Sequence, residues 1–489
     1  MKKILYYAII AFIFLLSFYF YSSLFYPALN SDNAISILMV HYFKLPHDLY
    51  FWGQDRLGSL IPLIGQIPFK IFGLSALVSE SITHYGILLA GFLAFSTFLK
   101  SLFYKIVFAM VWFFPPMHLI DVTQFYFGIH YSLIAIVCYL LTLFTKERIR
   151  QNSVVMNLML LIIILITILV VWVSDMALVS VIILFGIQLF YYLKENKLSG
   201  IVFKKPYLYY ASGGIIIGYI FIHYAKSTAF NSQNYTALGD LGSIIQTLLF
   251  FIKTITDMLL FKSNETFTSI YSYLVILLIL LSVFLLPKMK INDLTRKWAL
   301  FFLLDAIILF SAIILSKWTL VNNVPRRYFT CTYIAFSLAM LMLFDNLVVN
   351  KTATHLLKSL LIITVLIGGA GTIYNLKYIW PKTLTPMVKV VGEFQQLGNI
   401  GVIADYWNSY ITSCTSPESI KATPHDQTLS VRNPEMVDEV FEQPNLYLIK
   451  DMWLDSFPDT INQFGRVLIK DGEQFNIGNC GVCKYRKSH

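Results

Sequence analysis

Long apolar runs separated by short polar segments dominate the chain. Eleven of these runs approach or exceed the roughly 20 residues that a membrane-spanning helix needs. Their approximate limits are residues 4–26, 75–99, 106–120, 128–145, 153–173, 176–193, 207–224, 268–287, 298–316, 328–349 and 355–375. The third run is short, and the fifth and sixth form a tight hairpin around Ser174 and Asp175. The pattern predicts a mainly α, polytopic membrane protein with about eleven transmembrane helices.

Composition supports this prediction. The chain is 57% hydrophobic and 13% charged, whereas an ordinary soluble protein has roughly 25% charged residues. Such a chain cannot cover its own surface with polar groups, so most of it must use lipid as its solvent. This excludes a cytosolic enzyme, a disordered chain and a disulfide-rich secreted scaffold.

The basic residues indicate the orientation. With the N-terminus inside, the short inner segments hold 17 Lys and Arg residues, the longer outer loops hold 9, and the tail holds the other 11. Cytoplasmic loops are enriched in Lys and Arg, so we interpret the formal charge of +10 as mainly an orientation signal and not as a nucleic-acid footprint. The first run lacks a clear cleavage site and is interpreted as a retained anchor.

An odd number of spans places the tail outside. Residues 376–489 have the only sustained soluble composition, with short apolar runs separated by Pro, Asn, Asp and Gly. We therefore expect a transmembrane domain at 1–375 and a small extracytoplasmic α/β domain at 376–489, in an integral plasma (inner) membrane protein. Cys480 and Cys483 form a CxxC pair in this tail, which leaves a disulfide or a zinc site open.

The first outer loop, residues 27–74, is long enough to carry function. Apolar residues at helical spacing predict an amphipathic interface helix over 32–43, with Asp32 at its start. Asp32 could be a helix N-cap, a role that Asn30 or Ser31 could also fill, or a general base. Both can be true, because a helix N-terminus favours the ionised form that a base requires. Asp48 and Asp55 follow, and Trp52 between them is an interface anchor or a sugar-stacking ring.

Three further outer edges carry polar groups. They are Asp121 with His130 and Tyr131 before the fourth span, Asp175 between the fifth and sixth, and Arg326, Arg327 and Tyr328 before the tenth. Each group alone is more often structural, but together on one side they indicate a site. The arginine pair could bind a lipid phosphate through two oxygens or anchor its span to headgroups. Residues 244–260 predict an outer amphipathic helix, which could be a lid or a surface attachment, and Asp305 lies inside the ninth span.

These segments resemble the GT-C superfamily of integral membrane glycosyltransferases, which includes protein O-mannosyltransferases and bacterial aminoarabinose transferases. The similarity covers nearly the whole chain. It is carried by SDNAISIL after the first span, FWGQDRLGSL, GIHYSL, WVSDMAL and PRRYFT, and by IADYWNSYITS in the tail.

The resemblance implies an inverting transfer of a sugar from a polyprenyl phosphate to a lipid, polysaccharide or protein acceptor outside the cytoplasm. Asp32 would be the base, and Arg326 or Arg327 would stabilise the departing phosphate. His130, Tyr131 and Asp175 would orient the substrates. Many relatives carry a second acid where this chain has Asn33, so Asp55 or Asp121 would supplement Asp32, and a divalent metal stays open.

The main alternative is a transporter or flippase for a lipid-linked or small polar substrate. That function favours polar groups at mid-membrane and paired repeats, and only Asp305 meets the first condition. A non-catalytic anchoring protein would need none of the aligned outer acids. The sequence therefore favours transfer over transport.

Overall fold

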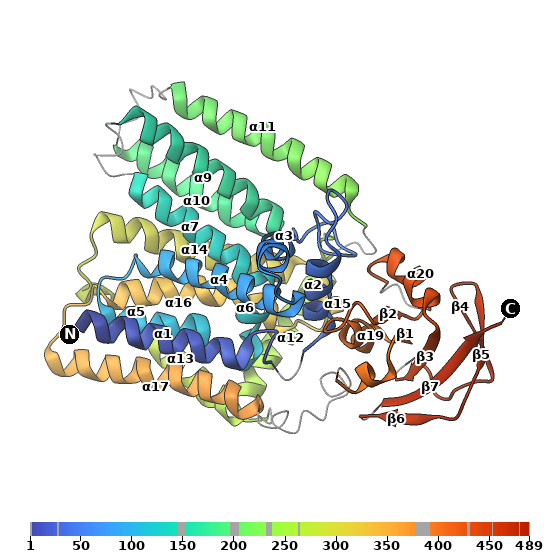
Figure 1. Cartoon of the computed structure of the whole chain (residues 1–489). Helices are drawn as coiled ribbons and strands as arrows, with labels where there is room; N and C mark the ends of the chain where they lie inside the picture. The colour runs from blue at the N-terminus through green and yellow to red at the C-terminus, as the bar shows by residue number, and fades with distance from the viewer. Residues whose placement is uncertain are drawn as a thin grey trace. The chain divides into compact units, whose positions relative to one another are not determined.

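The computed structural model divides the chain into two compact units (Figure 1). The structure describes residues 2–26, 29–144, 152–195, 205–230, 237–262, 265–376, 392–427, 431–451, 453–478 and 480–488. Unit 1 comprises 1–20, 85–222 and 234–375, and unit 2 comprises 21–84, 223–233 and 376–489. The basic loop residues Lys146, Arg148, Arg150, Lys197 and Lys204 lie outside the described residues.

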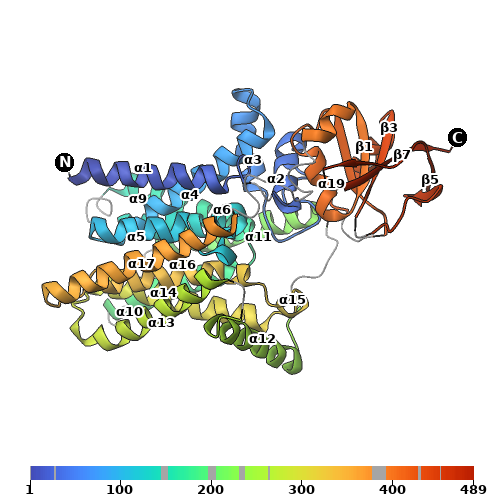
Figure 2. The ribbon, with the colours of Figure 1, turned by 90° about the horizontal axis from the view of Figure 1, so that it is seen from below.

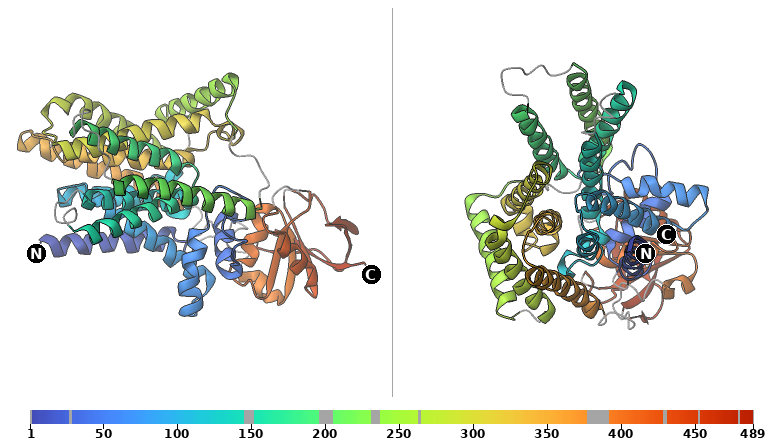
Figure 3. Two further views of the ribbon diagram at one scale, coloured as in Figure 1. Left: turned by 90° about the horizontal axis from the view of Figure 1, so that it is seen from above. Right: turned by 90° about the vertical axis from the view of Figure 1, so that its left-hand side faces the viewer.

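Apolar helices build most of the chain. They are α1 (Lys2–Tyr21), α4 (Ala76–Ser96), α5 (Leu102–Phe113), α6 (Asp121–Gln124), α7 (Tyr126–Phe144), α9 (Ser153–Val173), α10 (Ala177–Glu195), α11 (Lys205–Thr228), α12 (Leu241–Leu259), α13 (Thr266–Leu285), α14 (Asp293–Leu315), α15 (Lys317–Val321), α16 (Thr330–Phe344) and α17 (Lys351–Leu376). Short 3₁₀ turns cover Met117–Leu119 and Arg326–Phe329. The right-hand view of Figure 3 looks along the helices of unit 1.

Within the described residues, ten helices are long and apolar enough to cross a membrane, or eleven if a bent pair counts as one span. The chain is thus a multi-pass membrane protein, as its hydropathy pattern predicts. The bent pair is α5 with the segment 117–124, which turns by 78°. Pro115 and Pro116 stand at the bend, where they lack the N–H groups that would continue the helix, and this explains the short third run.

The set of spans differs from the expected one in a single region. Helix α12, expected on the surface, is long and apolar enough to cross, whereas α11, expected as a span at 207–224, is not among the candidates. Helix α12 begins at Leu241, before the predicted amphipathic stretch, and its only charges are Lys253 and Asp257, one turn apart.

Side-chain caps mark the starts of two helices of unit 1, and two of its helices pack side by side. The Asn152 side chain accepts hydrogen bonds from the N–H groups of Val154 and Val155 at the start of α9, and the Asn292 side chain caps α14. Figures 1 and 2 show α14 and α16 side by side.

Unit 2 contains the first loop and the tail. The loop forms α2 (Ser31–Tyr42), α3 (Leu60–Gln66) and a π-helical turn at Ile67–Ile71. Helix α2 confirms the predicted helix, and the Asn30 side chain caps it by accepting a hydrogen bond from Asn33 N–H. Ser31 and all residues from Asn33 to Val40 are buried, because α3 and α19 of the tail pack against this helix. The helix is therefore enclosed on more sides than an interface helix would be.

The tail forms an α/β domain around a seven-stranded mixed sheet. Its elements are β1 (Ile400–Ala404), α19 (Tyr406–Ser413), β2 (Ile420–Pro424), α20 (Pro434–Glu442), β3 (Asn445–Lys450), β4 (Thr460–Gln463), β5 (Arg466–Lys470), β6 (Phe475–Ile477) and β7 (Cys480–Lys487), after a 3₁₀ turn at Gln395–Leu397. The strand order is β2-β1-β3-β7-β5-β4, with β6 paired to β7. Strands β1, β2 and β3 are parallel, and β7 runs antiparallel to β3. Helix α19 packs beside β1 and β2 (Figure 2).

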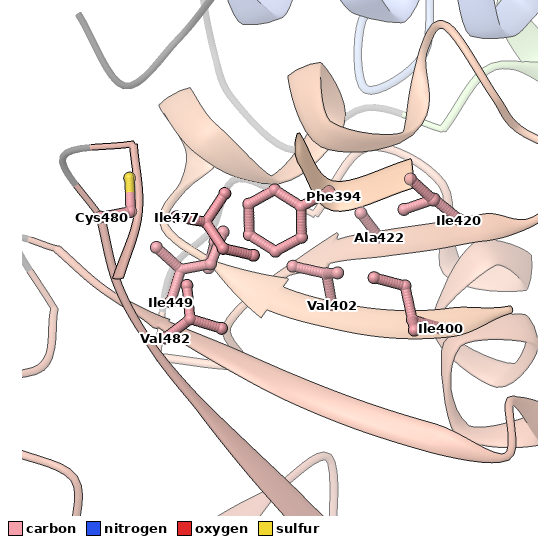
Figure 4. Packing of buried hydrophobic residues seen from close by; sticks show 10 residues of the cluster. Phe394, Ile400, Val402, Ile420, Ala422, Ile449, Ile477, Cys480 and Val482 are labelled. Carbon is pink, nitrogen blue, oxygen red and sulfur yellow. The ribbon is translucent and has the colours of Figure 1, made fainter. Parts of the chain in front are cut away.

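The sheet separates two apolar clusters, and the CxxC cysteines lie one in each. Figure 4 shows Cys480 in the cluster that gathers around Phe394, whereas Cys483 packs with Phe441 of α20. Alternate residues of a strand face opposite sides of a sheet, so a spacing of three places the two thiols on different faces. Both are free and buried, and each packs in an apolar core.

Candidate functional site

The first candidate cluster surrounds Asp32 in unit 2. Asp32 lies in the first turn of α2, where the helix dipole stabilises negative charge. One carboxylate oxygen, Oδ1, accepts a hydrogen bond from the Tyr406 hydroxyl at 2.8 Å. No Lys, Arg or His side chain forms an ion pair with Asp32 among the residues that the structure describes. The Asp32 residue is partly exposed.

The other polar residues of the first loop hold the loop in shape. Asp48 is buried and accepts hydrogen bonds from the Trp52 indole N–H at 2.8 Å and from Lys44 N–H at 2.7 Å. Trp52 is itself buried, so its ring contributes to packing. Asp55 is half-buried in a turn whose two arms pair at Tyr50 and Gly58. Within the described chain, no hydrogen bond joins Asp55 to Asp32.

The second candidate cluster surrounds the two arginines of unit 1. Arg326 Nη1 lies 3.2 Å from Glu265 Oε2, and His118 Nε2 lies 2.6 Å from Glu265 Oε1. Burial raises the pKa of Glu265, but the His118 hydrogen bond and the charges of His118 and Arg326 outweigh it and lower that pKa to about 2. Glu265 is therefore a carboxylate that partly neutralises Arg326.

The neighbouring arginine has a looser partner. Arg327 Nη1 lies 3.7 Å from Asp121 Oδ2, and the Arg327 side chain is 39% exposed. Its guanidinium carbon lies 5.8 Å from the centre of the Tyr328 ring. The structure thus brings Arg327, Tyr328 and Asp121 together.

The remaining predicted residues of unit 1 are His130, Tyr131 and Asp175. His130 is buried, with Nε2 3.8 Å from Cys331 Sγ. The Tyr131 hydroxyl donates a hydrogen bond of 2.7 Å to Asp305 Oδ2 inside the helix bundle. Asp175 is half-buried at the turn between α9 and α10. His130 and Tyr131 are buried among helices, whereas the Arg327 side chain is 39% exposed.

Three contributors escaped the sequence reasoning: Tyr406, Glu265 and His118. Tyr406 stood in the quoted segment IADYWNSYITS, but nothing in its local pattern indicates a partner 374 positions away. Glu265 begins α13 next to an apolar run, where it would be interpreted as a helix-start acid.

A metal site was left open by the sequence. No group of three His, Cys, Asp or Glu side chains is placed to hold a metal ion in the described ranges. Asn33 follows Asp32, and its side chain is buried. We therefore derive no step that passes through a metal.

Comparisons with known proteins identify the fold. No family model matches the chain, and no curated protein matches it by sequence. ArnT from Cupriavidus metallidurans bound to undecaprenyl phosphate aligns over 99% of this chain and 98% of its own, with a TM-score of 0.59 and 10% identity. Its apo state aligns over 99% and 97%, with a TM-score of 0.60 and 9% identity. A looser likeness, at a TM-score of 0.44 and 12% identity, relates 92% of the chain to 70% of the oligosaccharyltransferase AglB from Archaeoglobus fulgidus.

The match to ArnT spans both chains nearly end to end. At this identity it establishes the fold alone: the chain has the fold of the ArnT structures. The resemblance inferred from the sequence motifs is confirmed at that level.

Proposed function

We propose that this chain is a membrane glycosyltransferase that moves a sugar from a polyprenyl phosphate to an acceptor hydroxyl, with inversion at the anomeric carbon. The full-length likeness to a structure that holds undecaprenyl phosphate carries this proposal. The reaction takes place on the extracytoplasmic side of the plasma (inner) membrane, where the donor must arrive on a lipid. The acceptor is a lipid, a polysaccharide or a protein.

Asp32 supplies the base in this proposal. It removes the proton from the acceptor hydroxyl, whose oxygen then attacks the anomeric carbon, while the bond from that carbon to the phosphate oxygen breaks. The bonding electrons leave with the polyprenyl phosphate. Asp32 suits the role because no cation neutralises it within the described residues and its helix N-terminus favours the charged form.

Arg327 and Arg326 supply positive charge to the donor phosphate. A guanidinium binds phosphate oxygens in pairs and stabilises the charge that develops as the phosphate departs. Six further residues are proposed to bind or orient substrate: Tyr328, Asp121, His130, Tyr131, Asp175 and Trp52. Asp55 is proposed to supplement the base.

The test compares the glycans of cells with and without this protein. Mass spectrometry of surface glycans and lipid-linked sugars should show one sugar missing from its acceptor when the chain is absent. Asp32→Asn should reproduce that loss while leaving expression and membrane insertion intact. The control is Asp438→Asn, because Asp438 is an exposed acid that pairs with Arg466 on the surface of the tail domain. If the glycans do not change without the protein, the proposal is wrong.

Transport remains the second candidate because of one observation. Asp305 is fully buried in α14 and accepts a hydrogen bond from Tyr131, and acids inside membrane helices often serve ion or proton movement. Asp305→Asn should abolish uptake of a polar substrate if the chain is a transporter. A glycosyltransferase should keep its product with this variant.

A further inference from the structure

The tail domain places a tyrosine on the carboxylate proposed as the base. The Tyr406 hydroxyl donates to Asp32 Oδ1 at 2.8 Å, and the Ser31 hydroxyl donates to the Tyr406 carbonyl. Both contacts lie inside unit 2, so one compact body holds the two segments. Asp32 Oδ2 accepts no hydrogen bond from the residues that the structure describes. The carboxylate is therefore held by one oxygen, and the other oxygen remains available.

An arginine stacked on the ring holds Tyr406 in place. The Arg432 guanidinium carbon lies 5.1 Å from the centre of the Tyr406 ring, within the range of a cation–π contact. Arg432 Nη1 donates to the Gly53 carbonyl at 3.3 Å, and Arg432 N–H donates to the Tyr410 hydroxyl at 2.7 Å. Arg432 thus connects Tyr406 to the FWGQD segment of the first loop.

The start of α19 is fixed from the sheet side. The Asp405 side chain accepts from Asn408 N–H at 2.8 Å and caps the helix that Tyr406 begins. Asp451, directly after β3, accepts from Asp405 N–H at 3.1 Å and from the Asn408 side chain at 3.0 Å. Tyr406 therefore projects from a helix end whose position the sheet determines.

We propose that Tyr406 is a positioning residue for Asp32, held by Arg432, and that the tail domain thereby completes the catalytic base. The inference rests on the proposed function. The Tyr406 hydroxyl fixes Oδ1, so Oδ2 takes the proton from the acceptor hydroxyl. Tyr406 keeps its own proton throughout, and the electron balance of the transfer is unchanged.

The environment of Tyr406 agrees with a permanent donor. Burial, followed by the charge of Asp32, raises the pKa of Tyr406 well above its ordinary value. The hydroxyl therefore stays protonated at any pH at which a cell envelope works. A tyrosine in this state donates to a carboxylate and does not compete with it for the acceptor proton.

The first measurement needs no activity. Infrared difference spectra between the full-length protein and Asp32→Asn isolate the carboxylate stretch of Asp32. Tyr406→Phe should shift that band, because it removes the donor and keeps the ring. Tyr485→Phe is the matched control, since it removes a tyrosine hydroxyl that donates to the Pro458 carbonyl in the same domain. An unshifted band in Tyr406→Phe overturns the proposal, whether or not the protein is active.

The second measurement separates positioning from structure. With a polyprenyl-phosphate sugar in proteoliposomes, Tyr406→Phe should lower kcat by roughly tenfold and leave the donor KM unchanged. The acidic limb of its pH–rate profile should move upward by up to about one pH unit, because the ionised carboxylate has lost a donor. Arg432→Met should give a smaller change of the same kind, and Tyr485→Phe should behave as wild type.

The outcomes distinguish the two proposals. A shifted band with unchanged kcat and unchanged pH profile refutes the positioning role while transfer stands. If Tyr406→Phe and Tyr485→Phe lose the same thermal stability and Tyr406→Phe leaves the pH profile unchanged, Tyr406 is only a structural contact. If the wild-type protein transfers no sugar, and cells with and without it carry the same glycans, the proposed function is refuted. This inference is then refuted with it.

Discussion

Arg326 and Arg327 are neighbours in sequence but differ in what neutralises them. Glu265 lies 3.2 Å from Arg326 and also contacts His118, whereas Asp121 lies 3.7 Å from Arg327. Arg326 is 29% exposed and Arg327 is 39% exposed. A phosphate that approaches this pair reaches Arg327 more readily, because the Arg327 side chain is the more exposed of the two.

We expect Arg327→Ala to weaken use of the lipid donor more than Arg326→Ala does. Charge-assisted hydrogen bonds contribute about 1.5–3 kcal/mol, so the donor KM should rise about tenfold or more in Arg327→Ala. The acceptor KM should stay near its wild-type value. Steady-state kinetics with each substrate varied in turn measure both. Arg296→Ala is the control, as Arg296 is an exposed arginine paired with Asp293, and equal effects on donor and acceptor would indicate structural anchoring.

Gly53 shows why the FWGQD segment needs its glycine. Its φ is +73°, and a Cβ there would lie 2.5 Å from Arg432 Cδ. Gly465 has nearly the same φ, +72°, with nothing within 4 Å of the added Cβ. A substitution at either glycine would therefore strain the backbone. Only a substitution at Gly53 would also make the added Cβ collide with Arg432.

Gly53→Ala should destabilise unit 2 more than Gly465→Ala. The backbone strain costs about 1–2 kcal/mol at each position, and the collision adds to it at Gly53 because Arg432 must leave the Tyr406 ring. Thermal unfolding of the full-length protein in detergent measures both variants. Equal losses would show that Arg432 moves aside freely, contrary to its proposed role in holding Tyr406.

At the scale of elements, the tail domain contains a carboxyl group that folding has made less acidic. Burial raises the pKa of Asp451 to about 6, from about 4 in an unfolded chain. The folded state therefore favours the protonated form. The stability that this proton provides is present below about pH 4 and is lost as the pH rises through about 6.

Asp451→Asn should therefore remove the part of the pH dependence of folding stability that comes from this carboxyl group. The variant keeps an oxygen for the Asp405 and Asn408 donors and has no charge to bury. Because Asp451 is partly exposed and screened, we expect it to be more stable than wild type by about 1 kcal/mol at pH 7, with the difference vanishing near pH 4. Melting curves between pH 4 and 7 measure this. The control is Asp471→Asn at an exposed ion pair, and a wild-type curve that is flat over this range would contradict the prediction.

Helices and strands with a strong hydrophobic periodicity were predictable, whereas the elements that pack against them were not. The first loop helix follows from its apolar spacing and its Asn30 cap, but its burial depends on α19, far along the chain. The CxxC spacing suggested a disulfide or zinc, and the strand period instead placed the thiols on opposite faces of the sheet. The place of Asp32 in the first turn of α2 was predictable, while its contact with Tyr406 required the folded tail. Long-range pairing has no local signature in a single sequence.

At the scale of the whole molecule, the topology depends on whether α11 or α12 crosses the membrane. With the N-terminus inside and the bent pair counted as one span, eleven crossings place the tail outside whether α11 or α12 is the crossing helix. The segment between them distinguishes the two cases. Ser227, near the end of α11, lies outside if α11 crosses and inside if only α12 does.

Thiol labelling of intact cells should determine this topology. All five native cysteines are buried, so a membrane-impermeant maleimide should react mainly with an introduced thiol. Glu473→Cys in the exposed tail turn should be labelled without permeabilisation, and Lys290→Cys before α14 only after it. We expect Ser227→Cys to behave as Glu473→Cys does, because the basic loops predict that α11 crosses. If Lys290→Cys were labelled in intact cells and Glu473→Cys were protected, the orientation would be the inverse of the predicted one. The proposed base would then lie on the cytoplasmic side.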